Sequence, residues 1–463
     1  MSLPLTRRTL LLGSAATVLL GACATPWSAP PLPPIVFVHG NGDTAALWTT
    51  TLWRFESNGW PRERLHAIDI PYPLARDDDT KAQEGRSSTA DNMAFLAAEI
   101  DRVLQATGAR QVVLIANSRG GNAVRNYLAN FGAPGSGASR VSHAILCGTP
   151  NHGVYADPKR NPNGEFNGAG PFLAGLNAPK GPNGDEVTPG VRWLTIRSDN
   201  NDKYAQPDGV WIGAKGVATN VTFEGPALKG AENAVIPGID HRETAYSAKA
   251  FEQMFRFITG RSPASLAIVP EATVVLDGKL SGYFAYAAQG VVPTNLPLPG
   301  ASVEIFATDP ATGERLGPAR HRRTVGADGR WGPFTGDAQT RYEFVIAAPG
   351  YATTHLYRSP FPRSSTIVNL RAEKLLDADK DAAAVVFLTR PRGYFGVPRD
   401  QIGLDGKSPP AGIPSGVAGV ASAKLKLSDG VGRAVVGTFN DERLVGRTWP
   451  AANNELSYLE LMY

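Results

Sequence analysis

Hydrophobic positions along residues 34–260 alternate between short continuous apolar runs and runs with helical spacing. The apolar run at residues 112–115 predicts a buried strand. Residues 89–107 place an apolar side chain every three or four positions, behind Ser88 or Thr89 as the cap, and predict an amphipathic helix. Strands that alternate with helices usually form a mainly parallel sheet with helices on both faces. We therefore expect an α/β fold for this part of the chain.

The pattern changes after residue 260, where helical spacing mostly stops. Short alternating runs separated by turn residues then predict strands at residues 301–307, 341–346 and 385–388. We therefore expect an all-β C-terminal region after the α/β domain. The expected domains are an α/β domain over residues 35–260, a β-sandwich-like domain over 261–371 and a further β-rich region over 372–463.

The composition agrees with a globular protein of several domains. The chain has 463 residues, which is too long for one typical core. Its hydrophobic content of 42% and charged content of 19% are ordinary for a folded protein. The net charge of +4 is spread along the chain without a basic stripe, which argues against nucleic acid as a partner.

The N-terminus predicts export. Twin arginines at positions 7 and 8 precede an apolar stretch that is too short to span a membrane, which is typical of a Tat-type signal. The stretch ends in Leu-Gly-Ala-Cys23, close to a lipobox, so we expect a periplasmic or outer-membrane lipoprotein anchored through lipidated Cys23. The alternative is simple cleavage nearby, which would release a secreted protein. The expected segments are a signal over residues 1–23 and a Pro-rich linker over residues 24–34.

A candidate nucleophile follows the buried strand at residues 112–115. The sequence Ala-Asn-Ser-Arg-Gly-Gly at residues 116–121 predicts a nucleophile elbow, in which a sharp strand-to-helix turn exposes Ser118. Small residues two positions before and after the serine allow strand and helix to pack closely. An ordinary loop is the alternative, because Ser-x-Gly alone is common.

The oxyanion donors are expected at a second strand end. An apolar run ends in His39-Gly40-Asn41-Gly42, where glycines let backbone N–H groups approach a ligand. Acyl transfer needs such donors at the oxyanion that develops in the tetrahedral intermediate. We expect the backbone N–H groups of Asn41 and Arg119 to supply them. His39 itself is expected to have a structural role in the turn.

His241 is the candidate general base. It lies in a loop between a strand expected at residues 218–223 and a helix expected at 247–258, after the elbow in the chain. The order nucleophile, acid, histidine is that of α/β-hydrolases.

The acid has several candidates after the strand expected at residues 191–197. Asp202 is favoured over Asp199, which could instead close a turn, and Asp208 or Asp240 remain open. Nothing in the sequence requires a metal or another cofactor.

A long loop rich in Gly, Pro and Asn occupies residues 151–190. It stands at the position where α/β-hydrolases, whose order of nucleophile, acid and histidine the candidate residues resemble, insert lids. We expect Phe172 and Leu173 in this loop to contact the substrate. The alternative is that these apolar residues hold the loop on the body of the protein. Cys147 precedes the loop and is expected to be a small buried apolar residue.

These motifs resemble those of lipases and esterases of the α/β-hydrolase superfamily. Residues 36–40, the elbow and residues 147–153 are similar to bacterial class 2 lipases. Residues 251–260, 268–270 and 355–365 more closely resemble a long-chain archaeal lipase with a C-terminal β-barrel region. That resemblance implies Ser118 and His241 as nucleophile and base. It breaks at the acid, because Cys147 stands at the matching position, and Asp202 remains the better candidate.

The sequence therefore predicts a serine hydrolase that cleaves carboxylic esters of apolar acyl chains, without a cofactor. Its expected partner is an ester, which could be a lipid, a small ester or a polyester. The alternatives are an extracytoplasmic polyester depolymerase and a non-catalytic binding protein that kept the fold.

Overall fold

The computed structural model describes Met1 and residues 32–132, 137–213, 215–217, 219–286 and 290–463. The expected signal, Cys23 and most of the Pro-rich linker lie outside these residues. Within the described residues, no helix is both long and apolar enough to cross a membrane.

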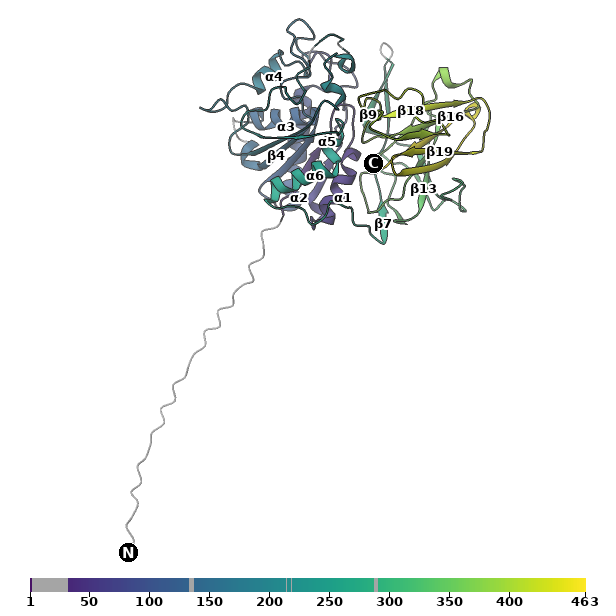
Figure 1. Ribbon diagram of the computed structural model, residues 1–463. Coiled ribbons are helices and arrows are strands. Elements are labelled where there is room, and N and C mark those ends of the chain that lie inside the picture. The colour runs from purple at the N-terminus through teal and green to yellow at the C-terminus, as the bar shows by residue number, and fades with distance from the viewer. Residues whose placement is uncertain (2–31, 133–136, 214, 218, 287–289) are drawn as a thin grey trace. The chain divides into compact units, whose positions relative to one another are not determined.

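Six parallel strands form the sheet of the N-terminal part of the chain (Figure 1). Their order is β2-β1-β3-β4-β5-β6, and β3, the expected elbow strand, has all of its residues buried. The carboxyl ends of parallel strands meet at one edge of a sheet, so the loops after β1, β3, β5 and β6 lie near one another. The strands are β1 Ile35–Val38, β2 Leu65–Ile68, β3 Val112–Asn117, β4 Val141–Cys147, β5 Arg192–Ser198 and β6 Glu232–Ile236.

Helices cover both faces of this sheet, as expected. On one face, Val36 of β1 shares a buried cluster with Leu96 of α2 and Val124 of α3. The next residue, Phe37, points to the opposite face and contacts Phe55 of α1, which in turn contacts α6. The helices are α1 Thr49–Ser57, α2 Thr89–Thr107, α3 Arg119–Asn130, α4 Pro171–Leu176, α5 Glu243–Tyr246 and α6 Ala248–Thr259.

Local capping explains where α2 begins. The Ser88 hydroxyl accepts a hydrogen bond from Asp91 N, and the Asp91 carboxylate accepts one from Ser88 N, so the two residues form a capping box. The helix ends at Gly108, which has a positive φ of 63°. The sequence pattern therefore located both ends of this helix.

The prediction of a strand at residues 218–223 is wrong. Ala218 lies outside the described residues, and residues 219–223 form turns and bends. Their backbone is held by Arg197, whose Nη1 donates to Thr222 O at 3.0 Å. The sixth strand is β6, nine residues later. It has mostly exposed or half-buried side chains, so no apolar run marks it in the sequence.

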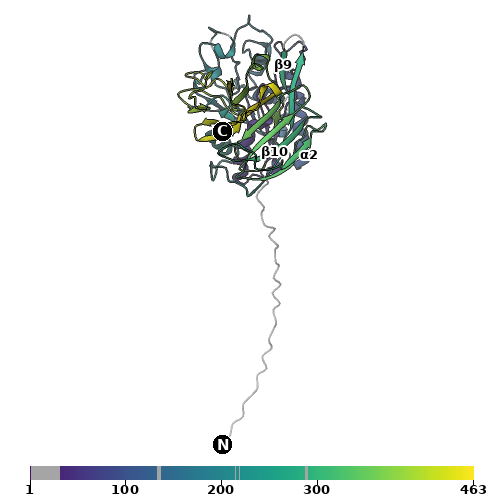
Figure 2. The same cartoon turned by 90° about the vertical axis from the view of Figure 1, so that its right-hand side faces the viewer.

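The C-terminal region consists mainly of strands, as expected (Figure 2). Its largest sheet has the order β11-β10-β13-β14-β21-β16-β18. The last strand, β21, lies between β14 and β16 and is parallel to both, so strands from both sides of residue 371 form one sheet. Residues before and after the domain boundary expected at residue 371 therefore belong to the same sheet. Its strands are β10 Ser302–Thr308, β11 His321–Thr324, β13 Arg341–Ala347, β14 Thr353–Arg358, β16 Ala384–Thr389, β18 Ser422–Leu427 and β21 Glu455–Glu460.

Smaller sheets complete the region. One pairs β12 with β7, one has the order β15-β8-β9, and one has the order β17-β19-β20. Their strands are β7 Thr273–Leu276, β8 Leu280–Tyr286, β9 Gly290–Pro297, β12 Phe334–Asp337, β15 Leu370–Arg371, β17 Ile402–Leu404, β19 Ala434–Phe439 and β20 Glu442–Arg447.

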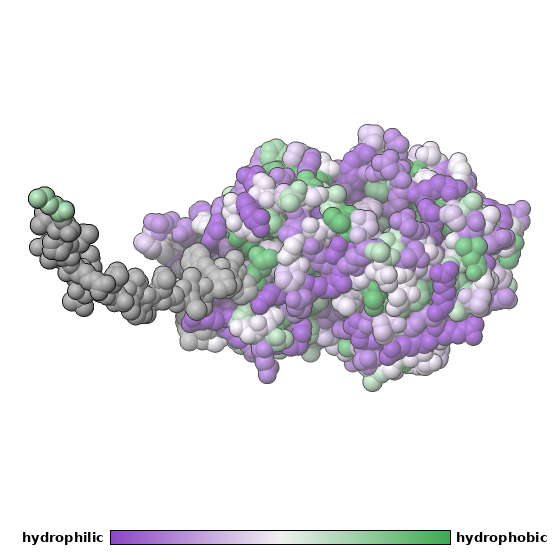
Figure 3. Space-filling view, turned by 90° about the horizontal axis from the view of Figure 1, so that it is seen from below, coloured by the Kyte–Doolittle hydropathy of each residue, from purple (hydrophilic) through white to green (hydrophobic). Residues whose placement is uncertain are grey.

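The α/β part and the C-terminal region share contacts within one compact unit, Pro33–Tyr463. Trp53 of α1 belongs to the buried cluster of the C-terminal strands, and its indole N–H donates to Ser364 O at 2.9 Å. Asn295 of β9 donates through Nδ2 to Asp43 O at 2.9 Å. On the face shown in Figure 3, hydrophobic residues lie scattered among hydrophilic ones. The contacts show that the C-terminal region packs directly on the loops beside β1.

Candidate active site

Ser118 occupies the turn between β3 and α3. Its φ of 52° and ψ of −122° are unusual for a residue with a side chain. The turn is held by hydrogen bonds from Ser118 N to Cys147 O at 2.8 Å and from Gly121 N to Ser118 O at 3.0 Å. This backbone is the strained strand-to-helix turn that the elbow motif predicts.

The neighbouring glycines are required by close backbone approach. A Cβ at Gly120 would lie 2.6 Å from His39 O, and a Cβ at Gly40 would lie 2.9 Å from the Ser118 Cβ. These distances are shorter than real Cβ contacts allow, so a side chain at either position would displace the backbone. The two motifs recognised in the sequence therefore pack directly on each other.

His241 lies in the loop between β6 and α5 and contacts Asp202, which follows β5. The distance between His241 Nδ1 and Asp202 Oδ2 is 2.6 Å, and both side chains are buried. The second carboxylate oxygen of Asp202 accepts a hydrogen bond from Tyr204 N at 2.8 Å. The Tyr204 ring lies edge-on to the imidazole, with centroids 4.7 Å apart. These contacts fix the imidazole with its Nε2 side directed away from the carboxylate.

The other candidate acids have different partners. Asp199 accepts hydrogen bonds from Asn201 N and Gly238 N, both at 3.0 Å, and so closes the turn after β5. Asp208 accepts one from Val210 N at 3.0 Å. Asp240 pairs with Arg390, as described below. Among the residues that the structure describes, Asp202 is therefore the candidate acid that contacts His241.

A pocket of about 240 Å³ contains both Ser118 and His241. Its wall is mainly apolar and aromatic, and comes from the loops after β1, β4 and β5. Gly148 and Pro150 also line the pocket. The other lining residues are Asn41, Val154, Tyr155, Phe166, Tyr204, Trp211, Ile212 and Val221. The arrangement can hold an apolar group next to a hydroxyl and an imidazole.

Phe172 and Leu173 do not line this pocket. Leu173 is fully buried and Phe172 half-buried in α4, which packs against α3. Arg125 of α3 fixes the end of α4 by donating to Leu176 O at 3.1 Å and to Asn177 Oδ1 at 2.7 Å. Arg125 and the buried Leu173 therefore hold this part of the loop on the body, and the substrate contact predicted for Phe172 and Leu173 is not supported. The same loop reaches the pocket instead through Tyr155 and Phe166, which no sequence motif marks.

The two residues whose amides are the expected oxyanion donors, Asn41 and Arg119, follow the neighbouring strands β1 and β3. Asn41 lines the pocket beside Ser118, and its side-chain Oδ1 accepts a hydrogen bond from Ala75 N at 2.8 Å. Arg119 is the first residue of α3, so its N–H has no acceptor within the helix. Both amides remain our candidates for the oxyanion hole.

The Arg119 side chain has a role that the sequence did not indicate. It is fully buried, and its Nε donates to Glu165 Oε2 at 2.7 Å while Nη2 donates to Ser87 O at 2.7 Å. Burial raises the pKa of Glu165, although Arg119 opposes that shift. Glu165 comes from the Gly-rich loop, where no local sequence signal marks it as a partner of the elbow.

His39 and Cys147 have structural roles, as expected. His39 Nε2 accepts a hydrogen bond from Ile70 N at 3.0 Å, so its Nδ1 donates to Gly40 O at 2.9 Å. Burial lowers the pKa of His39. Cys147 is fully buried, and burial raises the pKa of its thiol. Among the described residues, no group of three or more His, Cys, Asp or Glu side chains could hold a metal ion.

Comparisons with known proteins support the two-part architecture. Residues 33–173 match the family model described as alpha/beta hydrolase fold, and residues 272–375 match the model described as lipase C-terminal domain. A non-heme chloroperoxidase from Burkholderia pyrrocinia is 30% identical over 121 residues, which are 26% of this chain. The match spans 38% of the length of that relative.

Among solved structures, the chain is similar to a lipase and to a phospholipase. The mature lipase BlEst2 from Bacillus licheniformis is 21% identical, with a TM-score of 0.34 over 50% of this chain and 94% of that one. Phospholipase PlaB from Legionella pneumophila is 12% identical, with a TM-score of 0.35 over 92% of this chain and 93% of that one. The sheet and the family models together show an α/β-hydrolase domain followed by a C-terminal region of mostly strands.

Proposed function

We propose that this protein is a serine hydrolase that cleaves carboxylic esters with apolar acyl chains through an acyl-enzyme. One observation carries the proposal. His241 lies 2.6 Å from Asp202 and lines the same pocket as Ser118, whose backbone has the strained conformation of a nucleophile elbow. A serine, a histidine and a carboxylate in this arrangement form the constellation of nucleophilic acyl transfer.

In the proposed reaction, Ser118 Oγ attacks the ester carbonyl and His241 Nε2 accepts its proton. The Asp202 carboxylate holds the imidazole and stabilises the imidazolium that forms. The backbone N–H groups of Asn41 and Arg119 stabilise the oxyanion. His241 then returns the proton to the leaving alcohol, and water attacks the acyl-enzyme with His241 as base.

The pocket wall supports an apolar acyl group as the substrate feature that is recognised. Apart from the candidate catalytic groups, the lining side chains are almost all aliphatic or aromatic, as in Val154, Phe166 and Ile212. None of these three can pair with a charged substrate. An uncharged acyl chain buries its surface there without leaving a polar group unpaired.

The test is the rate of hydrolysis of p-nitrophenyl esters from short to long acyl chains, using protein without residues 1–23. Wild type should hydrolyse at least one chain length, and Ser118→Ala should lose activity by a factor on the order of 10⁶. Circular dichroism of Ser118→Ala should match that of wild type. Wild type without activity on any ester, or undiminished hydrolysis by Ser118→Ala, would refute the proposal.

A further inference from the structure

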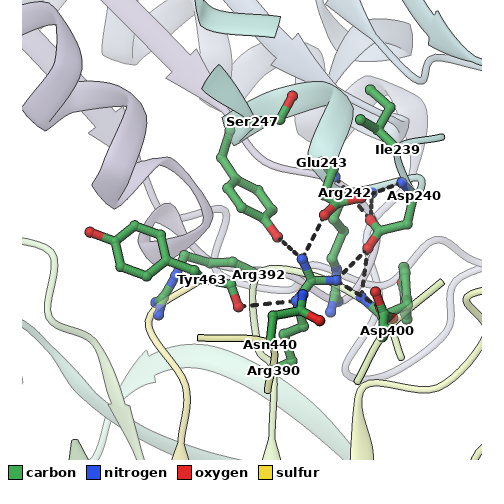
Figure 4. A network of polar contacts seen from close by, with 12 residues as sticks. Ile239, Asp240, Arg242, Glu243, Ser247, Arg390, Arg392, Asp400, Asn440 and Tyr463 are labelled. Carbon is green, nitrogen blue, oxygen red and sulfur yellow. Dashed lines mark hydrogen bonds and ion pairs between the residues drawn. The ribbon is translucent and has the colours of Figure 1, made fainter. Parts of the chain in front are cut away.

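A segment far away in the chain contacts both loops that carry the candidate base and acid. We call residues 390–420, which follow β16, the clamp segment. They begin about 150 positions after His241, and they belong to the C-terminal region. Figure 4 shows Arg390 of this segment directed at Asp240 and Glu243.

The first contact of the clamp segment is with Asp240, the residue before His241. Asp240 is fully buried, and its Oδ2 accepts hydrogen bonds from Arg390 Nη1 at 2.7 Å and Tyr394 N at 2.8 Å. Its Oδ1 accepts hydrogen bonds from Arg242 N and Glu243 N, at 2.8 and 2.9 Å. One carboxylate therefore ties the turn that carries His241 to the clamp segment.

The second contact is with Glu243, which begins α5. Arg390 Nη2 donates to Glu243 Oε1 at 2.6 Å, and Arg399 Nη1 donates to Glu243 Oε2 at 2.8 Å. Arg390 is itself fixed by donating to Tyr246 Oη at 2.8 Å and to Tyr463 O at 3.0 Å. Every nitrogen of its guanidinium therefore has a partner, and the group has a single position.

The third contact is with the loop of Asp202. Asp202 forms an isolated parallel bridge with Ala418, and the neighbouring Lys203 donates through Nζ to Gly419 O at 3.2 Å. Lys203 Nζ also lies 3.9 Å from the centre of the Tyr394 ring. The clamp segment thus contacts the acid loop and the base loop together.

We propose that Arg390 is a positioning residue for His241: it fixes the loop of the base against the C-terminal region, and so sets the geometry of the His241–Asp202 pair. This inference rests on the proposed function of the site. A buried ion pair is weak evidence for stability, since desolvation offsets its attraction. Its contribution here is geometric, because a displacement of about 1 Å in a catalytic group can cost roughly 10²-fold in rate.

The test compares Arg390→Gln with Arg315→Gln. Arg315 also makes two hydrogen bonds to carboxylate oxygens, both on the fully buried Glu343, at 2.6 and 3.0 Å, but it lies between β10 and β11 in the C-terminal region and does not line the pocket. Arg399→Gln is the milder variant in case Arg390→Gln does not fold, because it removes a hydrogen bond to Glu243 and a longer ion pair to Asp240 but leaves the contacts of Arg390 with both in place. Arg390→Lys is the conservative variant, which keeps the charge.

Two measurements are made on each variant. The first is kcat and KM on the best p-nitrophenyl ester, with kcat divided by the fraction of molecules that an organophosphonate titrates. The second is hydrogen–deuterium exchange of residues 239–246. Arg390→Gln should lower kcat by about 10²-fold with KM unchanged, and should speed exchange in this loop. Arg390→Lys should recover part of kcat, and Arg315→Gln should change neither quantity.

Each outcome decides between positioning and a merely structural role. Unchanged kcat per titrated site and unchanged exchange of residues 239–246 in Arg390→Gln would overturn the inference, as would an equal loss in Arg315→Gln. If Arg390→Gln does not fold, the same criteria apply to Arg399→Gln, with a smaller expected loss. If wild type hydrolyses no ester, the proposed function fails, and the exchange measurement alone then decides whether Arg390 fixes the loop.

Discussion

The two halves of the candidate site are built in different ways. The nucleophile half comes from neighbouring strands: Ser118 follows β3, Gly40 follows the adjacent β1, and their backbones are in direct contact. Its buried arginine, Arg119, pairs with Glu165 of the same domain. The base half is tied to the C-terminal region by the ion pairs of Arg390, whereas the loop after β1 contacts that region through the Asn295 amide.

Because of this difference, the two halves need different contacts in order to form. The elbow needs the sheet, a strained serine and glycines at the closest contacts, all of which a short segment specifies. The loop of His241 is followed by a four-residue helix, α5, which by itself is too short to be stable. Tertiary contacts must therefore supply the order that local structure does not. They come from Arg390 and also from α1, where Thr51 and Arg54 donate to the carbonyls of Ala245 and Tyr246.

After the loss expected for Ser118→Ala, the next largest effect lies in the base half. Asp202→Asn keeps the shape of the side chain but removes the charge that faces His241 Nδ1. We expect kcat on a p-nitrophenyl ester to fall by about 10⁴-fold, because the imidazole loses its orienting and stabilising carboxylate. Steady-state kinetics at a fixed pH measure this loss.

Asp199→Asn is the matched control, because Asp199 is the competing candidate three residues earlier. It accepts hydrogen bonds from backbone N–H groups of the turn after β5. We expect its substitution to reduce stability slightly and to leave kcat nearly unchanged. A larger loss of kcat in Asp199→Asn than in Asp202→Asn would reverse the assignment of the acid.

The second effect concerns the stability of the nucleophile half. Glu165→Gln leaves the Arg119 guanidinium buried without a carboxylate, which typically costs about 3–5 kcal/mol. Urea unfolding should show this loss in the free energy of unfolding. Glu304→Gln is the control, because Glu304 pairs with the exposed Arg322, and such surface pairs contribute at most about 1 kcal/mol. Similar losses in the two variants would show that the buried pair contributes no more to the free energy of unfolding than the surface pair does.

The nucleophile half could be predicted from the sequence because its signals are local. Ser118, its glycines and the preceding strand lie within about ten residues, and the close contacts explain why small residues stand there. The amphipathic helix α2 was found for the same reason. The fold class followed from the alternation of such segments.

The base half was only partly predictable. His241 could be selected by chain order, but the choice between Asp199 and Asp202 depends on the conformation of one turn. The strand β6 escaped detection because it carries few buried residues. Arg390 could not be found at all, since no sequence pattern marks a contact between residues 150 positions apart. These features depend on tertiary packing, which a local pattern does not record.

A third prediction uses pH to test the base half. Burial lowers the pKa of Lys203 from its ordinary value of 10.5 to about 8; Arg242 adds to this shift and Asp202 opposes it. Between pH 8 and 10.5 the unfolded chain therefore binds more protons at Lys203 than the folded chain does. The free energy of unfolding should gain from this group as pH rises through that range, by at most about 1.4 kcal/mol per pH unit.

The measurement is the difference in urea unfolding between wild type and Lys203→Met from pH 7 to 10.5. The difference removes the contribution of other groups that titrate in this range. Wild type should become more stable relative to Lys203→Met as pH rises. A difference that is independent of pH, or that changes in the opposite direction, would show that Lys203 is not held in the buried position beside Gly419 and Tyr394.

The smallest expected effect on activity is that of a substitution in the Gly-rich loop of residues 151–190. Phe172→Ala should leave kcat/KM nearly unchanged for every acyl length, because Phe172 lies outside the pocket, on a helix that packs against α3. Trp211→Ala is the comparison, since Trp211 lines the pocket and rests on Gly419 of the clamp segment. Loss of apolar wall should lower its kcat/KM by about tenfold or more, most strongly for long chains. If Phe172→Ala instead shows the larger, chain-length-dependent loss, the acyl chain lies along α4 and the pocket beside Trp211 holds another part of the substrate.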